Sequence, residues 1–196
     1  MGTNVSVILL AAGRSQRMGA KKQLLPIQGR PAVARCLESL RDAQAAEIVL
    51  VVNPEADDIV EAAKDFPVRV AVNEVPGSDM AASVMTGLAC INREAAGVLV
   101  CPCDHPLVRP KTIEAMISAH VRMPDAIIIP VHRGRKGHPT LFPRALLEEL
   151  GTGATMRDVI GRHHAKISLL NVDDEGVILD MDTPEDYRRI LDRDSP

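Results

Sequence analysis

The sequence predicts an α/β fold built on a mostly parallel sheet. Short apolar runs alternate with segments of helical periodicity along the chain. Its 196 residues are enough for a full core, and the 46% hydrophobic and 25% charged residues are ordinary for a globular protein. No internal repeat or low-complexity linker divides it. We therefore expect one domain over residues 1–196, three-layered and Rossmann-like, with helices on both faces of the sheet.

Nearly continuous apolar runs indicate strands that are buried on both faces. The first is Val5–Leu10, which an Ala-Ala-Gly sequence ends. Similar runs follow, the last of them weaker: Ile48–Val52, Val68–Val72, Gly97–Cys101, Ala126–Pro130 and Lys166–Val172.

Apolar residues at helical spacing separate these runs. Thr183 and Pro184 are typical of a helix start and predict a last helix that carries Tyr187 and Ile190. The basic stretch 132–138 predicts a mobile loop or a hairpin arm. Four other helices are predicted. One follows Pro31 and carries Val33, Leu37 and Leu40; a second carries Met80, Val84, Leu88 and Ile91; a third carries Ile113, Met116, Ile117 and His120; and a fourth spans Arg144–Leu150.

Composition narrows the function classes. The net charge of −3, the 2% aromatic residues and the lack of Trp disfavour a nucleic-acid partner. No apolar run approaches the ~20 residues that span a bilayer, and the N-terminus does not resemble a secretory signal. We therefore expect no membrane association and a cytoplasmic location. The four cysteines, at positions 36, 90, 101 and 103, fit free thiols in a reducing compartment.

The loop after the first strand suits a polyphosphate. Ala11, Ala12 and Gly13, directly after Leu10, allow close approach to the backbone, whose N–H groups can cradle phosphate oxygens. The spacing matches neither a P-loop nor a dinucleotide fingerprint. The alternative is a tight turn with solvated basic residues. Four cations within nine residues favour phosphate binding: Arg14, Arg17, Lys21 and Lys22.

Two acidic positions are candidates for a metal. Asp104 follows the strand Gly97–Cys101, where a carboxylate suits Mg²⁺; the alternative is a cap for the helix near Pro110. Asp180 and Asp182 have strand spacing and can face one side. Either one would complete the site, although Asp182 also fits an ordinary helix start. The Cys-x-Cys pair is a weak zinc signal that packing explains equally well.

A helix face of small residues is a candidate for binding a base. Ser83 and Gly87 lie one turn apart, so a flat base could lie against them while the Ser83 hydroxyl bonds its edge. Close packing of this helix on the sheet is the alternative.

The first loop, Leu10-Ala-Ala-Gly-x-Ser-x-Arg-Met-Gly-x-x-Lys22, resembles the signature loop of nucleotidyltransferases that act on the molybdenum cofactor. In having alanine at position 12, the chain resembles the branch that transfers CMP to molybdopterin. The guanylyl-transferring branch usually has glycine at this position. Asp104-His-Pro106 and the closing Asp-x-Asp-Thr-Pro-Glu-Asp also match, so the likeness covers roughly residues 5–191. It implies a fold of the nucleotide-diphospho-sugar transferase type, Mg²⁺ on Asp104, and Asp182 as the second ligand candidate.

The segment after the fifth predicted strand looks like the same family's Gly-His-Pro loop beside the acceptor substrate. This resemblance implies that Gly137, His138 and Pro139 bind the acceptor. The sequence departs from the family at Asp79, where glycine usually precedes Met80.

Together these observations predict nucleotidyl transfer by positioning and electrostatics. Lys22, Arg17 and Asp104 would be catalytic, and Gly13, Arg17 and Lys22 would hold the triphosphate. The acceptor phosphate would attack the α-phosphorus and release pyrophosphate. The resemblance implies CTP as donor, molybdopterin as acceptor and a molybdenum hydroxylase as client. A sugar-phosphate nucleotidyltransferase and a non-catalytic cofactor carrier stay open, as do the base, the acceptor and the oligomeric state.

Overall fold

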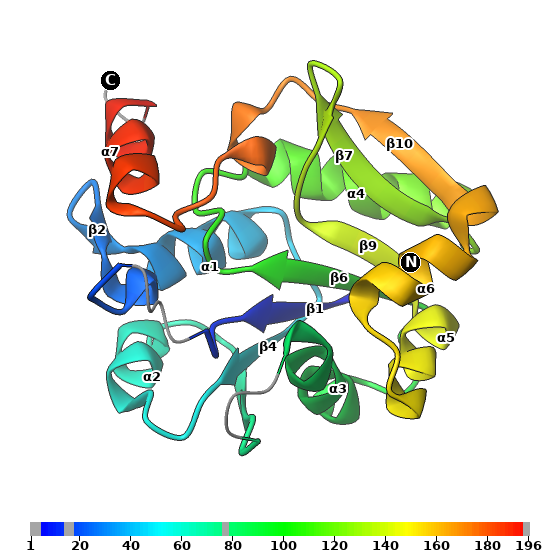
Figure 1. Ribbon diagram of the computed structural model, residues 1–196, viewed down its shortest axis with the longest axis horizontal. Helices are drawn as coiled ribbons and strands as arrows, with labels where there is room; N and C mark the ends of the chain where they lie inside the picture. The colour runs from blue at the N-terminus through cyan, green and yellow to red at the C-terminus, as the bar shows by residue number, and fades with distance from the viewer. Residues whose placement is uncertain (1–4, 14–17, 76–78, 194–196) are drawn as a thin grey trace.

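The computed structural model describes residues 5–13, 18–75 and 79–193. Its centre is strand β1 (Val5–Leu10), which pairs in parallel with β4 (Glu47–Val52) on one side and β6 (Gly97–Pro102) on the other (Figure 1). These runs are apolar throughout because both faces of the sheet are covered. The structure thus confirms the predicted α/β fold.

The main sheet runs in the order β10-β7-β9-β6-β1-β4-β5, and β8 pairs with β7. The outer strands are β5 (Arg69–Val72), β7 (Ile127–His132) and β10 (Ile167–Asn171). Strand β9 (Thr140–Pro143), which was not predicted from the sequence, runs antiparallel to both β6 and β7. Strand β8 (Arg135–Lys136) pairs antiparallel with β7 and forms a hairpin with it. The basic stretch 132–138 therefore forms a hairpin arm, one of the two predicted alternatives.

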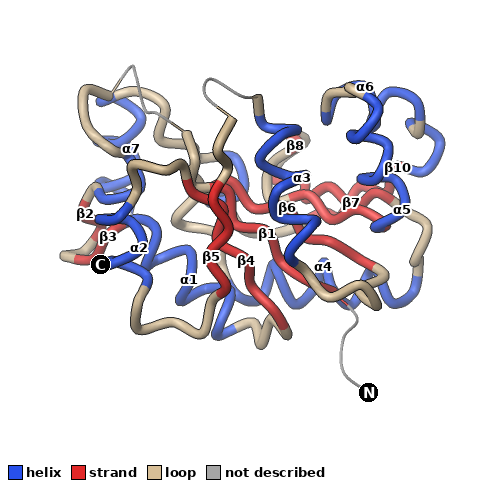
Figure 2. The backbone as a smooth tube through the Cα atoms, turned by 90° about the horizontal axis from the view of Figure 1, so that it is seen from below, coloured by secondary structure: helices blue, strands red, loops and turns tan. Residues whose placement is uncertain are grey.

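Helices cover both faces of this sheet, as Figure 2 shows edge-on. Val7 and Leu9 of β1 pack into the cluster that contains α1, α2 and α4, whereas Ile8 packs into the cluster of α3, α5 and α6. This alternation along β1 is why the chain needs apolar residues at every position of the strand. The helices are α1 (Ala32–Asp42), α2 (Asp57–Ala63), α3 (Met80–Cys90), α4 (Pro110–Arg122), α5 (Arg144–Leu147), α6 (Met156–Arg162) and α7 (Pro184–Arg193).

Two local features differ from the prediction. The helix expected over Arg144–Leu150 ends at Leu147 and continues as a 3₁₀ helix, Glu148–Thr152, before Gly153 adopts a left-handed conformation (φ 84°). Helix α2 was not predicted because it is short and has only two buried residues, Ile59 and Ala63.

A third, smaller cluster joins the two ends of the chain. Helix α7 packs Ile190 against Ile27 of the small β2–β3 hairpin (Pro26–Ile27 and Arg30–Pro31). The Tyr187 hydroxyl donates a hydrogen bond of 2.6 Å to the Pro26 carbonyl. The segment before α7 is thereby held beside the 3₁₀ helix η1 (Lys22–Leu24), at the end of the sheet toward which β1 and β6 point (Figure 1).

Candidate active site

The site lies where strand order reverses, at the carboxyl ends of β1 and β6. Beyond β1 the chain continues toward β4, with the Ala11 N–H donating to the Val51 carbonyl at 2.8 Å. On the other side the Cys103 N–H donates to the Leu10 carbonyl at 3.0 Å. These bonds place the first loop and Asp104 side by side.

Two amide side chains, those of Gln23 and Asn53, hold the first loop in place. Gln23, which is 1% exposed, donates from Nε2 to the carbonyls of Ala11 and Gly13, both at 2.8 Å. Asn53 Nδ2 donates to the Ala12 carbonyl at 3.3 Å. The backbone of residues 11–13 is therefore fixed from two sides before any ligand binds. Arg14 and Arg17, predicted to hold phosphates, lie outside the described residues.

Lys22 is the centre of the site. Its ammonium donates to Oδ2 of Asp104 at 2.6 Å and to Oδ1 of Asp182 at 3.0 Å. Three candidates chosen from separate parts of the sequence thus meet at one point. Asp180 lies elsewhere, exposed on the wall of a neighbouring cavity.

Neither aspartate is used as a helix cap. Helix α7 is capped by Thr183, whose hydroxyl donates to Asp186 at 2.6 Å and accepts from the Asp186 N–H at 3.2 Å. At the start of α4, the buried Asp174 accepts from the Arg109 N–H at 2.8 Å and the Thr112 hydroxyl at 2.6 Å. Other residues do the capping that Asp104 and Asp182 were considered for, and both carboxylates contact Lys22 instead.

Neighbouring charges and hydrogen bonds outweigh burial and keep this cluster ionised. Burial alone would lower the pKa of Lys22, but the adjacent carboxylates of Asp104 and Asp182 raise it above its ordinary value. Burial likewise would raise the pKa of Asp104, but the hydrogen bond from His105 and the charge of Lys22 hold that pKa well below its usual range. At neutral pH the site therefore contains a fixed cation between carboxylates.

Two histidines extend the site toward the acceptor loop. The Nδ1 atom of His105 lies 2.8 Å from Oδ1 of Asp104. The ring of His138 meets the His105 ring edge-on, with centroids 5.0 Å apart and planes at 64°. Burial lowers the pKa of His138 to about 4, so its imidazole is neutral at pH 7. A neutral ring can donate and accept hydrogen bonds beside an anionic ligand.

The predicted acceptor loop is held by its backbone. Gly137 packs so closely on the carbonyl of Val177 that a side chain would not fit, and the His138 N–H donates to that carbonyl at 2.8 Å. The peptide bond before Pro139 is cis. A cavity of about 260 Å³ opens beside this loop, lined among others by Asp104, His105, Arg135, Lys136, His138 and Asp180.

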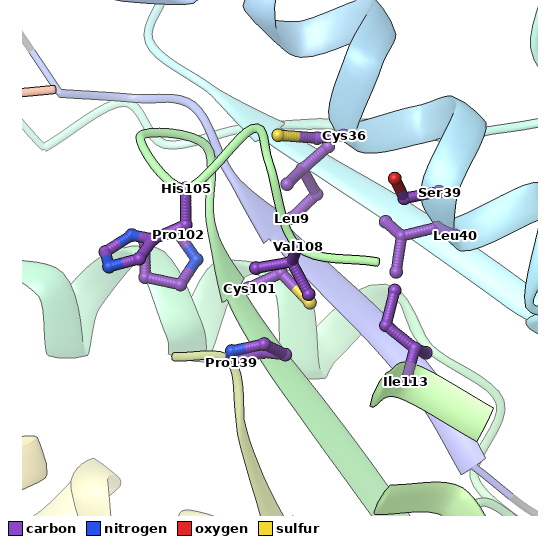
Figure 3. Close-up of a pocket in the computed structure, with 10 residues that line it drawn as sticks. All are labelled: Leu9, Cys36, Ser39, Leu40, Cys101, Pro102, His105, Val108, Ile113 and Pro139. Atoms are coloured by element: carbon purple, nitrogen blue, oxygen red, sulfur yellow. The ribbon is translucent and has the colours of Figure 1, made fainter. Parts of the chain in front are cut away.

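A small apolar pocket, lined by core residues together with His105 and Pro139, lies beside the same loop. Figure 3 shows residues that line it, among them His105, Pro139, Cys36 and Cys101. All four cysteines are free, and burial raises the pKa of the Cys101 thiol. In residues 5–13, 18–75 and 79–193 no group of three or more His, Cys, Asp or Glu is placed to hold a metal. Cys101 and Cys103 are both buried in the core, which fits the packing alternative.

The α3 face of small residues packs against the sheet. A Cβ on Gly87 would lie 2.6 Å from Cγ2 of Ile8, so this glycine allows α3 to approach β1. Ser83 is 7% exposed, and its hydroxyl accepts from Asn73 Nδ2 at 2.9 Å. This geometry favours the packing alternative for Gly87, and base binding by Ser83 stays a prediction.

The donor set fits a hard divalent cation. Mg²⁺ is typically bound by one or two carboxylates together with water and substrate phosphates. Asp104 and Asp182 converge on a single cation, the Lys22 ammonium, at distances of 2.6 and 3.0 Å. The two carboxylates can therefore serve the same ion when phosphate oxygens supply the remaining ligands.

Comparison with known proteins identifies the family. The protein-family model described as the MobA-like NTP transferase domain matches residues 7–167 of this chain. The chain belongs to this family. A protein described as a probable molybdenum cofactor guanylyltransferase from Natranaerobius thermophilus is 32% identical over 135 residues, 68% of this chain and 63% of that protein. Nicotine blue oxidoreductase from Paenarthrobacter nicotinovorans is 27% identical over 199 residues, 95% of this chain and 96% of that protein.

Other relatives differ in length. The bifunctional protein GlmU from Leifsonia xyli is 37% identical over 123 residues, but the chain spans only 25% of it. Among solved structures, Rv0371c from Mycobacterium tuberculosis superposes with a TM-score of 0.85 at 31% identity, covering 98% of this chain and 99% of that one. A complex of Rv0371c with manganese superposes with a TM-score of 0.77 at 27% identity, covering 98% and 100%. The chain is thus a nucleotidyltransferase-family member with a Rossmann-like sheet. None of the helices in the described ranges is long and apolar enough to span a bilayer.

Several residues of the site were missed by sequence reasoning. Gln23 and Asn53 act on main-chain carbonyls, Asp174 accepts from the Arg109 N–H and the Thr112 hydroxyl, and His105 acts on the side chain of its neighbour. Gln23 and Asn53 are uncharged and lie outside any spaced motif. His105 stands inside the quoted Asp-His-Pro sequence, which was the one available signal.

Proposed function

We propose that the chain transfers CMP from CTP to the terminal phosphate of molybdopterin that carries molybdenum, with release of pyrophosphate. The observation that carries the proposal is the convergence of Asp104 and Asp182 on Lys22 beside the fixed loop 11–13. The family membership and a relative described as a molybdenum cofactor guanylyltransferase support the reaction class and the acceptor. The choice of CTP rests on the resemblance at Ala12.

The residues divide the work by position. The backbone of residues 11–13 and the Lys22 ammonium bind the triphosphate, joined by Arg17 from the sequence motif. Asp104 and Asp182 would hold Mg²⁺, which would supply charge compensation for the phosphate oxygens. An oxygen of the acceptor phosphate attacks the α-phosphorus in line and forms a new P–O bond. The P–O bond between the α-phosphorus and the β-phosphate breaks, and its electron pair leaves with pyrophosphate. Lys22 stabilises the negative charge that develops on the phosphoryl oxygens.

The acceptor side needs no general base, because a phosphate monoester is already ionised near pH 7. Arg135 and Lys136 line the cavity beside the loop 137–139 and would attract an anionic acceptor. His138 is neutral at pH 7, so it can form hydrogen bonds with that acceptor without adding a positive charge. Delivery of the product to a molybdenum hydroxylase is the expected use.

The test is a pyrophosphate-release assay with Mg²⁺, each of CTP, GTP, ATP and UTP, and molybdopterin cofactor as acceptor. We expect release with CTP that requires the acceptor, and none from Asp104→Asn. Release with GTP instead of CTP would overturn the assignment of cytosine as the base. Release only when a sugar phosphate replaces the pterin would overturn the acceptor. Tight nucleotide binding without release would favour a carrier and overturn the enzyme assignment.

A further inference from the structure

His105 lies between the proposed metal ligand and the acceptor loop. Its Nδ1 atom is 2.8 Å from Oδ1 of Asp104, whereas Lys22 takes the other oxygen, Oδ2, at 2.6 Å. Each oxygen of Asp104 thus has its own partner. The His105 side chain is 9% exposed, so the ring has little freedom to leave this contact.

The chemistry sets the direction of this bond. An ionised carboxylate only accepts hydrogen bonds, so Nδ1 of His105 carries the proton and donates to Asp104. On its other side the ring packs edge-on against His138 and borders the apolar pocket that contains Val108 (Figure 3). Packing fixes the ring, and the ring fixes the carboxylate.

We infer that His105 is a positioning residue, which holds Asp104 so that Oδ2 alone faces the cation site and which joins this carboxylate to the acceptor loop through His138. This inference rests on the proposed function, because it assigns Asp104 to Mg²⁺. A carboxylate without such a partner rotates and presents either oxygen. Partners that orient a metal ligand are commonly worth about 10- to 100-fold in metal affinity.

Paired substitutions separate the hydrogen bond from the packing. His105→Asn keeps an N–H donor near the position of Nδ1, whereas His105→Phe keeps the ring volume without a donor. His105→Leu removes the same donor with a smaller side chain and guards against misfolding of the Phe variant. His163→Phe is the matched control, because it breaks a histidine–carboxylate contact of 2.6 Å to Glu149 on the α6 side, far from α7 (Figure 1).

The measurement is Mn²⁺ binding, followed by electron paramagnetic resonance of the unbound ion. The full-length host carries Lys22→Gln, which removes the ammonium from the carboxylates. We expect His105→Phe and His105→Leu to weaken Mn²⁺ binding about 10- to 100-fold. His105→Asn should stay within a few-fold of the host, and His163→Phe should have no effect. With Lys22 present, His105→Phe should lower kcat while the KM for nucleotide changes little.

The outcomes separate this inference from the proposed function. If Asp104→Asn abolishes Mn²⁺ binding in the host while the Phe and Leu variants bind like the host, the positioning role is overturned and the metal assignment stands. If His105→Asn weakens binding as much as His105→Phe, packing rather than the hydrogen bond is responsible, which also overturns it. A host that does not bind Mn²⁺, or binds it equally with Asp104→Asn, overturns the metal assignment and this inference with it.

Discussion

The ammonium of Lys22 lies 2.6 Å from Oδ2 of Asp104, although the two residues are 82 positions apart in the chain. Lys22 follows the loop after β1, and Asp104 follows β6, the parallel neighbour of β1. The same ammonium also reaches Asp182. In the free protein, a lysine side chain therefore occupies the point on which both proposed metal ligands converge.

Lys22→Gln should have opposite effects on two measurements. Turnover should fall about 10²- to 10³-fold, because a cation that stabilises transition-state charge is lost. Mn²⁺ binding to the free protein should tighten, because the competing ammonium no longer neutralises Asp104 and Asp182. Titration calorimetry with Mn²⁺ alone checks the second effect.

Lys21→Gln is the matched control for this measurement. Lys21 is the adjacent cation, but it pairs with Asp58 at 2.7 Å, on α2, away from Asp104. Its loss should leave Mn²⁺ affinity unchanged. Weaker Mn²⁺ binding by Lys22→Gln than by Lys21→Gln would show that the lysine helps rather than competes with the metal.

Asp182→Asn and Asp180→Asn should differ, although the two positions share one short segment. Asp182 contacts Lys22 at 3.0 Å, whereas Asp180 lines the cavity near His138. We expect Asp182→Asn to lower kcat about 10²-fold. Asp180→Asn should change the KM for the acceptor without changing Mn²⁺ affinity. Steady-state kinetics with both substrates varied distinguishes them, and equal losses of kcat would refute the assignment of Asp182.

Gly87→Ala should destabilise the fold by about 1–3 kcal/mol. The added Cβ would meet Cγ2 of Ile8 at 2.6 Å, so α3 must move away from β1. Gly161→Ala is the matched control in α6, because a Cβ there meets nothing within 4 Å. That variant should be about 0.5–1 kcal/mol more stable than wild type. Urea unfolding measures both, and a neutral Gly87→Ala would contradict the packing interpretation.

His120 should make stability depend on pH. It is 4% exposed on α4, and its Nδ1 atom is buried without a hydrogen-bond partner in the described residues. Burial lowers its pKa below the ordinary 6.5, against an opposing effect of the Asp125 charge. The unfolded chain therefore binds the proton more readily, so native stability falls as pH drops below about 6.5, by at most about 1.4 kcal/mol per pH unit for one proton.

His120→Leu removes this titration. Urea unfolding of wild type and variant between pH 8 and 5 should show the wild type losing stability relative to the variant on acidification. Groups common to both proteins cancel in the difference. A difference that stays constant over this range would mean that His120 titrates alike in the folded and unfolded chain.

Local pattern accounts for the elements that sequence reasoning found. The strands β1, β4 and β6 are uniformly apolar because the helical layers bury both of their faces, and that composition is visible without coordinates. Helix α7 was found from Thr183 and Pro184, because capping involves residues only a few positions apart.

Longer-range pairing accounts for what was missed. The four residues of β9 read as the edge of a loop, and they form a strand only because β6 and β7 lie on either side to bond with them. Gln23 likewise acquires its role from the path of the first loop, whose carbonyls it bonds. In both cases the hydrogen-bonding partners lie outside the local sequence pattern, so that pattern alone could not reveal the role.

The site shows the same division. The amino-acid sequence alone specifies the chemical groups, a lysine after the first strand and aspartates after the fourth strand and before the last helix, because side-chain type and strand ends are local properties. It does not specify that Asp182, 160 positions from Lys22, contacts it while Asp180 does not. That choice follows from the packing of α7 on Ile27 and from the bond of the Met181 N–H to the Asp104 carbonyl at 3.1 Å, and such contacts exist only once the chain has folded.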